Sequence, residues 1–133
     1  MATIRKEVEI NTSPAHAWDA LRDVGALHTK LCPNFVTDTK LEDGARMVTF
    51  ANGMKARELI VDVDDQQQRV AWSIVDNPQL THHNGSAQVF DAGNGRTRFV
   101  WIADVLPHSA ASTMGGAMEM GIQAIKKHLE ATA

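Results

Sequence analysis

Two adjacent histidines, His82 and His83, are the residues of this sequence best suited to acid–base chemistry. They stand in a stretch that alternates like a β-strand, so their side chains point to opposite faces and cannot share one metal ion. If Ala87 and Val89 face the protein interior, His83 faces it too. An imidazole in an apolar interior can give or take a proton near neutral pH. The plainer alternative is a histidine satisfied by a backbone carbonyl, with no catalytic role.

Arg57 is the second candidate for a chemical role. It shares the alternation of Leu59 and Val63, which predicts that its side chain lies on the apolar side of a strand. A guanidinium in that position could hold a carboxylate or enolate oxygen of a bound molecule. A one-residue shift in the strand would turn Glu58 inward instead, and an arginine at a strand end can also reach water. If the protein is an enzyme, His83 and Arg57 are its predicted catalytic residues.

The sequence lacks the motifs of the common metal and cofactor sites. It has no H-E-x-x-H, no paired C-x-x-C, no glycine-rich phosphate loop and no nucleophile elbow, so neither a metal nor a cofactor is expected. A net charge of −3 argues against nucleic acid as a partner, because phosphate binding needs a basic surface. No apolar run is long enough to span a membrane.

The single cysteine, Cys32, cannot form an internal disulfide, and one free thiol fits a cytoplasmic location. It follows a short predicted helix and has no evident basic neighbour that would activate it. We therefore expect a buried, inert thiol.

These side chains must be positioned around the amphipathic stretch 109–130, which reads as a helix about 30 Å long. Methionine adapts to varied shapes, and each glycine weakens a helix by about 1 kcal/mol relative to alanine. A face rich in both is typical of a helix that lines a cavity for an apolar molecule. The alternative is a loosely begun helix that starts after Gly116. The apolar side carries Met114, Met118, Gly121, Ile122, Ile125 and Leu129.

The rest of the chain alternates with a period of two between turn residues, such as Asp43-Gly44 and Asn52-Gly53. Such turns join antiparallel strands. The pattern therefore predicts an α+β fold: one domain, 1–133, with a curved, seven-stranded antiparallel sheet around the long C-terminal helix. The expected strands are 3–10, 35–41, 46–51, 56–64, 69–75, 80–90 and 97–105. Two short helices follow the first strand, one begun by Ser13-Pro14 and one over 24–31.

Three aromatic residues of the predicted strands, Trp72, Phe99 and Trp101, lie on the apolar side of the sheet. They are expected to form a cavity wall or plain core. His28 lies on the second short helix, near the expected mouth of a cavity, and is a further candidate for ligand contact.

Several segments resemble the START-like (SRPBCC) superfamily, which includes polyketide cyclase/dehydrase-like proteins, coenzyme-Q-binding proteins and lipid-transfer domains. The hairpins of 41–53 (LEDGARMVTFANG), the run from 58–65 into 69–73 (RVAWS), and 95–101 (GRTRFVW) before Pro107 carry the resemblance. It covers essentially the whole chain. It implies a helix-grip fold with a deep cavity between sheet and helix, which holds an apolar or amphipathic small molecule.

Three functions are compatible with these observations. The first is a carrier or sensor that binds a small hydrophobic molecule, such as a lipid, a quinone or a polyketide. The second is a cyclase or dehydratase, in which His83 abstracts a proton and Arg57 stabilises the enolate oxygen. The third is a protein-interaction module, which an exposed apolar patch around Val100 and Ile102 would favour. A homodimer is left open.

Overall fold

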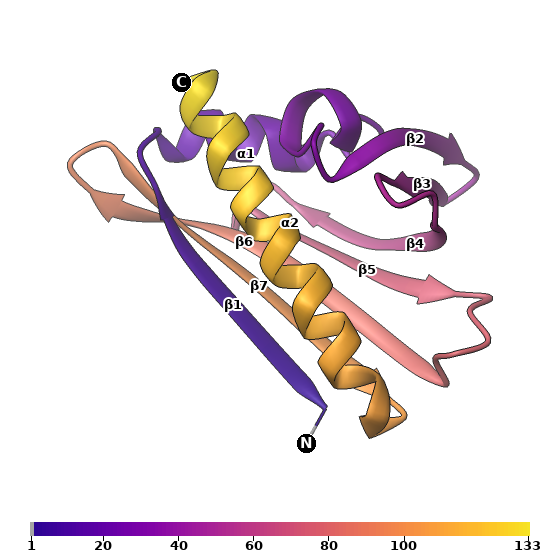
Figure 1. The fold of residues 1–133 in the computed structure, drawn as a ribbon. Coiled ribbons are helices and arrows are strands. Elements are labelled where there is room, and N and C mark those ends of the chain that lie inside the picture. The colour runs from indigo at the N-terminus through magenta and orange to yellow at the C-terminus, as the bar shows by residue number, and fades with distance from the viewer. Residues whose placement is uncertain (1) are drawn as a thin grey trace.

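The computed structural model describes residues 2–133, and its elements follow the predicted order (Figure 1). The sheet is antiparallel throughout, with the strand order β1-β7-β6-β5-β4-β3-β2. The prediction of an α+β helix-grip fold with seven strands is therefore confirmed. The elements are β1 (Thr3–Ile10), α1 (Pro14–Arg22), the π-helical turn η1 (Leu27–Leu31), β2 (Val36–Glu42), β3 (Ala45–Phe50), β4 (Lys55–Asp64), β5 (Arg69–Val75), β6 (His82–Gly93), β7 (Arg96–Leu106), the 3-10 turn η2 (His108–Ala110) and α2 (Ala111–Ala131).

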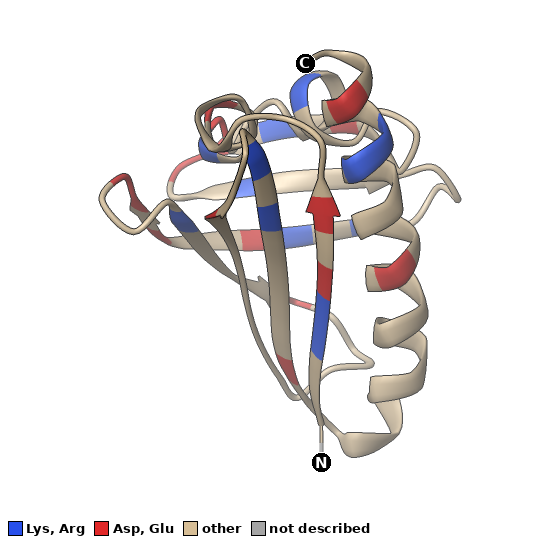
Figure 2. Ribbon diagram, turned by 90° about the vertical axis from the view of Figure 1, so that its left-hand side faces the viewer, with Lys and Arg blue, Asp and Glu red and all other residues tan. Residues whose placement is uncertain are grey.

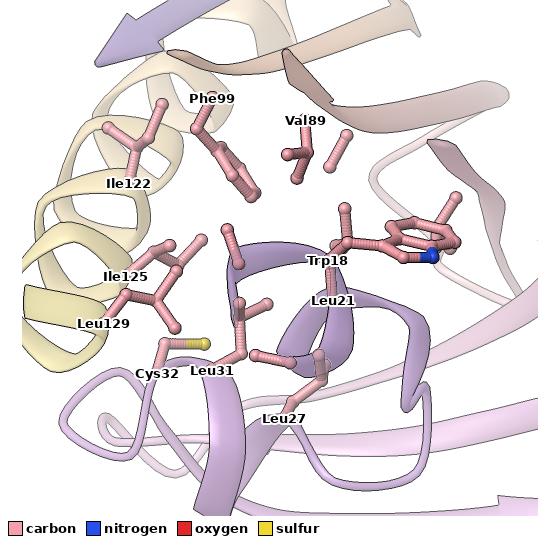
Figure 3. Close-up of a cluster of buried hydrophobic side chains, with 14 of the residues drawn as sticks. Trp18, Leu21, Leu27, Leu31, Cys32, Val89, Phe99, Ile122, Ile125 and Leu129 are labelled. Carbon is pink, nitrogen blue, oxygen red and sulfur yellow. The ribbon is translucent and has the colours of Figure 1, made fainter. Parts of the chain in front are cut away.

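The hydrophobic core lies between the concave face of the sheet and the helices that cover it (Figure 3). Phe99 of β7 is fully buried in this core, and α1 contributes Trp18 and Leu21 to it. Full burial of an aliphatic or aromatic side chain of this size stabilises a fold by roughly 1.5–3 kcal/mol. The long helix therefore contributes a large share of the stability. Its buried residues are Met118, Gly121, Ile122, Ile125 and Leu129.

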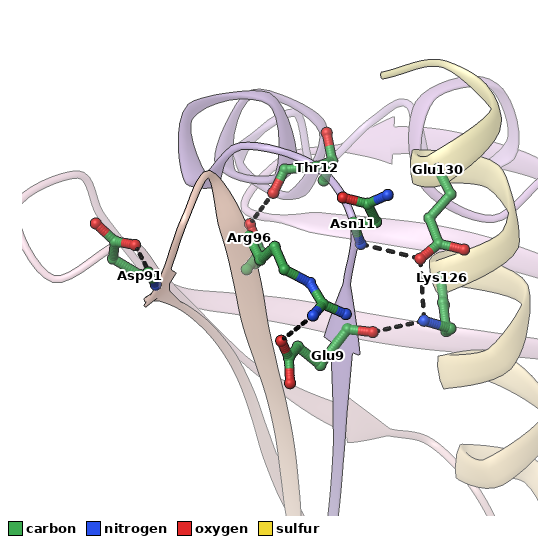
Figure 4. A network of polar contacts seen from close by, with 9 residues as sticks. Glu9, Asn11, Thr12, Asp91, Arg96, Lys126 and Glu130 are labelled. Carbon is green, nitrogen blue, oxygen red and sulfur yellow. Dashed lines mark hydrogen bonds and ion pairs between the residues drawn. The ribbon is translucent and has the colours of Figure 1, made fainter.

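Polar contacts fix the C-terminal end of α2 to the end of β1 (Figure 4). The amide of Asn11 donates to Glu130 Oε2 at 2.9 Å, and Lys126 Nζ donates to the carbonyl of Glu9 at 2.6 Å. The first turns of the helix are less buried, because Met114 and Gly115 are only half-buried and Gly116 is exposed. Burial along α2 is thus uneven.

Charged residues lie mainly on the outer surface, with both signs interspersed along β1 and α2 (Figure 2). Arg98 pairs with Glu7 at 2.8 Å and Arg96 pairs with Glu9 at 3.1 Å across neighbouring strands. Val100 shares this outer face but is only 5% exposed. Val100 therefore cannot belong to an exposed apolar patch of the kind that would favour an interaction module, and Ile102 is only partly exposed. None of the helices within residues 2–133 is both long and apolar enough to cross a membrane.

Two helix boundaries differ from the prediction. The long helix is already continuous from Ala111, so the alternative in which it begins after Gly116 is wrong. The second short helix is confined to five residues, Leu27–Leu31, in a π-helical turn. The residues before it, 23–26, form turns instead, with the amide of Ala26 donating to the carbonyl of Asp23 at 3.0 Å.

The glycines of α2 predict opposite effects of substitution. A Cβ at Gly121 would lie 2.8 Å from Cζ3 of Trp101 and 3.0 Å from Cε2 of Phe35, whereas one at Gly116 meets nothing within 4 Å. Gly121→Val should lower the free energy of unfolding by about 1–3 kcal/mol through overpacking. Gly116→Ala should raise it by about 0.5–1 kcal/mol through helix propensity. Urea unfolding of both variants measures this; equal effects would contradict the packing described here.

Candidate ligand cavity

A partly open cavity of about 100 Å³ lies between α2 and the concave face of the sheet. Most of its wall is apolar or aromatic, with side chains from α1, η1, the six strands β2 to β7 and α2. Such a wall excludes water and suits the apolar body of a small molecule. From α2 it takes Met114, Ala117, Met118 and Ile125, and from the middle of the sheet Trp72, Ala87, Phe99 and Trp101.

Five of the predicted ligand-binding residues line this cavity, namely Trp72, Phe99, Trp101, Met114 and Met118. Ile122 does not line it, although it belongs to the same hydrophobic core. Gly121 does not either. Its missing side chain instead gives Trp101 and Phe35 room to pack against the helix.

His28, a predicted ligand contact, is not among the residues that line the cavity. It belongs to η1 and its Nε2 is 4.0 Å from Asp38 Oδ1, on the neighbouring strand β2. Its Nδ1 is buried without a hydrogen-bond partner among the described residues. The helix predicted over 24–31 is a π-helical turn over Leu27–Leu31, and its residues Leu27 and Leu31, rather than His28, line the cavity.

Arg57 points to the outer face of β4, so the predicted inward direction is wrong. Its Nε is 3.3 Å from Glu42 Oε2 and one of its terminal nitrogens is 3.6 Å from Asp76 Oδ2. The register of β4 shifts between Ile60 and Asp62. This irregularity reverses the alternation, so Val63 packs on the core while Leu59 lies outside with Arg57.

Glu58 is the inward residue, and it forms a buried ion pair with Arg46 that the sequence analysis missed. Arg46 Nε donates to Glu58 Oε1 at 2.8 Å, with the two side chains 4% and 8% exposed. A terminal nitrogen of Arg46 also donates to the carbonyl of Val24 at 3.2 Å, and its guanidinium carbon lies 5.4 Å from the ring centroid of Trp72. The two residues face each other directly in the β3–β4 ladder. Both line the cavity, so its wall contains a charge pair.

His83 faces the cavity as predicted, and only 4% of its surface is exposed to solvent. Its Nδ1 accepts a hydrogen bond from the amide of Ile74 at 3.0 Å, which places the proton of the neutral ring on Nε2. Burial, and next the charge of His82, lower the pKa of His83 from 6.5 to about 4. At neutral pH the ring is therefore uncharged. It can donate a hydrogen bond from Nε2 but has no free lone pair with which to take a proton.

A larger, open depression of about 590 Å³ lies outside the cavity, at the ends of β5 and β6. Its wall runs along residues 73–78 and 80–83, and His83 borders both the depression and the cavity. His82 lies on the outside, where its Nε2 is 2.7 Å from Asn84 Oδ1. The adjacent histidines thus occupy the two faces that strand alternation predicted.

Cys32 also lines the cavity, and burial raises the pKa of its thiol to about 12. The thiol is therefore protonated and unreactive at neutral pH, as expected from the sequence. Within residues 2–133, no group of three His, Cys, Asp or Glu side chains has the arrangement of a metal site.

An antiparallel sheet that grips a long C-terminal helix, with a lined cavity between them, defines a START-like helix-grip protein. Residues 1–130 match the family described as "Polyketide cyclase / dehydrase and lipid transport", so the chain belongs to this family. A search of curated proteins finds no match.

Several solved structures share this fold. The protein XoxI from Bacillus cereus is 20% identical, with a TM-score of 0.86 over 100% of this chain and 99% of that chain. A START superfamily protein from Mycobacterium smegmatis is 13% identical, with a TM-score of 0.70 over 98% and 95%. A norcoclaurine synthase from Thalictrum flavum is 19% identical, with a TM-score of 0.65 over 98% and 96%. At these identities the likeness shows the fold alone.

The buried ion pair predicts that substitutions at two neighbouring positions of β4 differ strongly in their effect on stability. Glu58→Ala leaves Arg46 charged and unpaired inside the protein and should lower the free energy of unfolding by about 3–5 kcal/mol. Arg57→Ala removes only partly exposed ion pairs and should cost less than about 1 kcal/mol. Chemical denaturation at neutral pH compares the two variants. Similar losses would mean that Glu58 is not the buried partner.

The buried imidazole predicts a pH dependence of stability. Its pKa is lower in the folded than in the unfolded chain, so its contribution is complete above pH 6.5 and is lost as the pH falls toward 4. The free energy of unfolding should drop by about 1–2 kcal/mol from pH 7 to pH 5 on account of this group. His83→Asn, which keeps an acceptor for the Ile74 amide but does not titrate, should remove that drop. His82→Gln should retain it, and a drop unchanged in His83→Asn would refute the assignment.

Proposed function

We propose that this protein binds a small amphipathic molecule in the cavity between the sheet and α2, as a carrier or sensor rather than as a catalyst. The observation that carries the proposal is the composition of the cavity wall. It is apolar nearly throughout, and its charged or imidazole side chains are Arg46, Glu58 and His83. Apolar walls with a few placed polar groups are typical of sites that bind and orient a small ligand.

The size of the cavity bears on how a ligand is accommodated. About 100 Å³ is below the roughly 300–1,000 Å³ usual for ligand pockets. A lipid, quinone or polyketide would therefore need the cavity to widen. The part of the wall best able to yield is the N-terminal half of α2, where Met114 and Gly115 are half-buried and Gly116 is exposed. The opposite end of the helix is fixed to β1 by Lys126 and Glu130.

A cyclase or dehydratase activity is the alternative that the family description suggests. It would require His83 to act as the base and Arg57 to stabilise an enolate. The lone pair of His83 Nδ1 is engaged by the Ile74 amide, and Arg57 is paired with Glu42 outside the cavity. This geometry supports binding better than proton abstraction.

Two methionines of α2 provide a matched test of the proposal. Met114→Trp fills the cavity from its wall, whereas Met120→Trp adds the same bulk at a position that is 69% exposed and does not line it. Titration with an environment-sensitive hydrophobic dye should give at least a tenfold weaker affinity for Met114→Trp and an unchanged affinity for Met120→Trp.

Mass spectrometry of molecules extracted from the purified protein should then identify what occupies the cavity. Binding that is equally strong in both variants, or no binding in the wild type, would contradict the proposal. Turnover of the extracted molecule by wild-type protein, lost in His83→Asn with binding retained, would favour the enzyme instead.

A further inference from the structure

The polar groups of the cavity form one cluster around Trp72. The guanidinium of Arg46 lies over the Trp72 ring at 5.4 Å. A Cβ placed on Gly85 would be 3.1 Å from Trp72 Cε2 and 3.2 Å from His83 Cε1, so both rings flank Gly85. Glu58 reaches the same wall through its bond to Arg46. The cavity therefore combines apolar surface with a single polar region.

This polar region has no net charge. Arg46 and Glu58 compensate each other at 2.8 Å, and the His83 ring is neutral because Nδ1 accepts from the Ile74 amide. A third charge brought into this buried region would have no partner, and burying an unpaired charge is costly. A ligand carboxylate would also have to compete with Glu58 for Arg46, while an ammonium group would face the guanidinium.

The region nevertheless offers hydrogen bonds. The Nε2–H of His83 has no acceptor among residues 2–133, and this nitrogen is not one of the side-chain atoms sealed off without a partner. It therefore has accessible surface, and His83 borders both the cavity and the open depression beside it. A carbonyl or hydroxyl oxygen of a bound molecule is the natural acceptor for it.

We infer that the cavity selects an uncharged ligand, with an apolar body about the size of one ring and a carbonyl or hydroxyl oxygen directed at the donors of His83 and Arg46. This inference rests on the proposed function and specifies its ligand class. The size follows from the volume, since a cavity of 150 Å³ lined by apolar side chains is known to hold benzene. A cavity of about 100 Å³ needs little widening for a single ring.

The test compares probes that share one ring and differ in charge. Benzaldehyde and benzyl alcohol are neutral at pH 7, benzoate is an anion and benzylammonium a cation. Binding is followed by the fluorescence of Trp72 and Trp101, which line the cavity, with chemical shifts of the Ile74 amide as a second readout. The neutral probes should bind at least tenfold more tightly than either ion.

A charge swap inside the cavity should change this preference. Glu58→Gln leaves Arg46 as an unbalanced cation, so benzoate should become the tightest of the four probes. Glu42→Gln makes the same change of charge on the outer face, where Glu42 pairs with Arg57, and should leave the wild-type order intact. If Glu58→Gln does not fold, the wild-type series of four probes decides the question by itself.

The outcomes separate this inference from the proposed function. Tightest binding of benzoate or benzylammonium to the wild type would overturn the neutral ligand class and leave the cavity as a binding site. Binding of the hydrophobic dye with no binding of the neutral probes would overturn the ligand class in the same way. No binding of dye or probes would overturn the proposed function itself.

Discussion

The closure of a curved sheet by one helix is the constraint on which the other features depend. The concave face presents Phe99, Val89 and Trp72, and an apolar surface of this kind cannot stay in water. Among the helices of residues 2–133, α2 alone is long enough to span this face, and it covers the face unequally. Ile122 and Leu129 pack into the core away from the cavity, whereas Met114, Ala117 and Met118 border an unfilled space. The cavity therefore arises where the covering helix fits the sheet least closely.

The directions of side chains in β5 and β6 could be predicted from the sequence because alternation is regular there. Trp72 and His83 lie where a period of two places them. The same rule failed in β4, because the irregularity between Ile60 and Asp62 reverses the alternation within a single strand. A signal for the correct answer was nevertheless present. The hairpin turn at Asn52-Gly53 places Arg46 opposite Glu58, and opposite charges facing each other across a ladder indicate a pair.

The fold was predictable to a greater extent than the cavity. Turn residues such as Gly44 and Gly53, which adopt φ values of 69° and 87°, mark strand ends directly in the sequence. The boundaries of a cavity depend instead on how individual side chains fill space. Gly121 illustrates this, because it belongs to the apolar face of α2 yet serves to admit the Trp101 ring. His28 is a second example, because it stands in a π-helical turn of which Leu27 and Leu31, not His28, reach the cavity wall.

Cys32 gives this protein an internal reporter. It is the sole cysteine of the sequence, and its sulfur borders the same space as Met118 and Phe99. Burial keeps this thiol protonated. It reacts with an alkylating reagent only when the surrounding wall opens and hydration allows the thiolate to form. Any thiol labelling of the native chain therefore measures how often the interior becomes accessible, and a molecule lodged beside Cys32 shields it from the reagent. The native cysteine therefore reports, without an added label, how often the cavity opens to solvent.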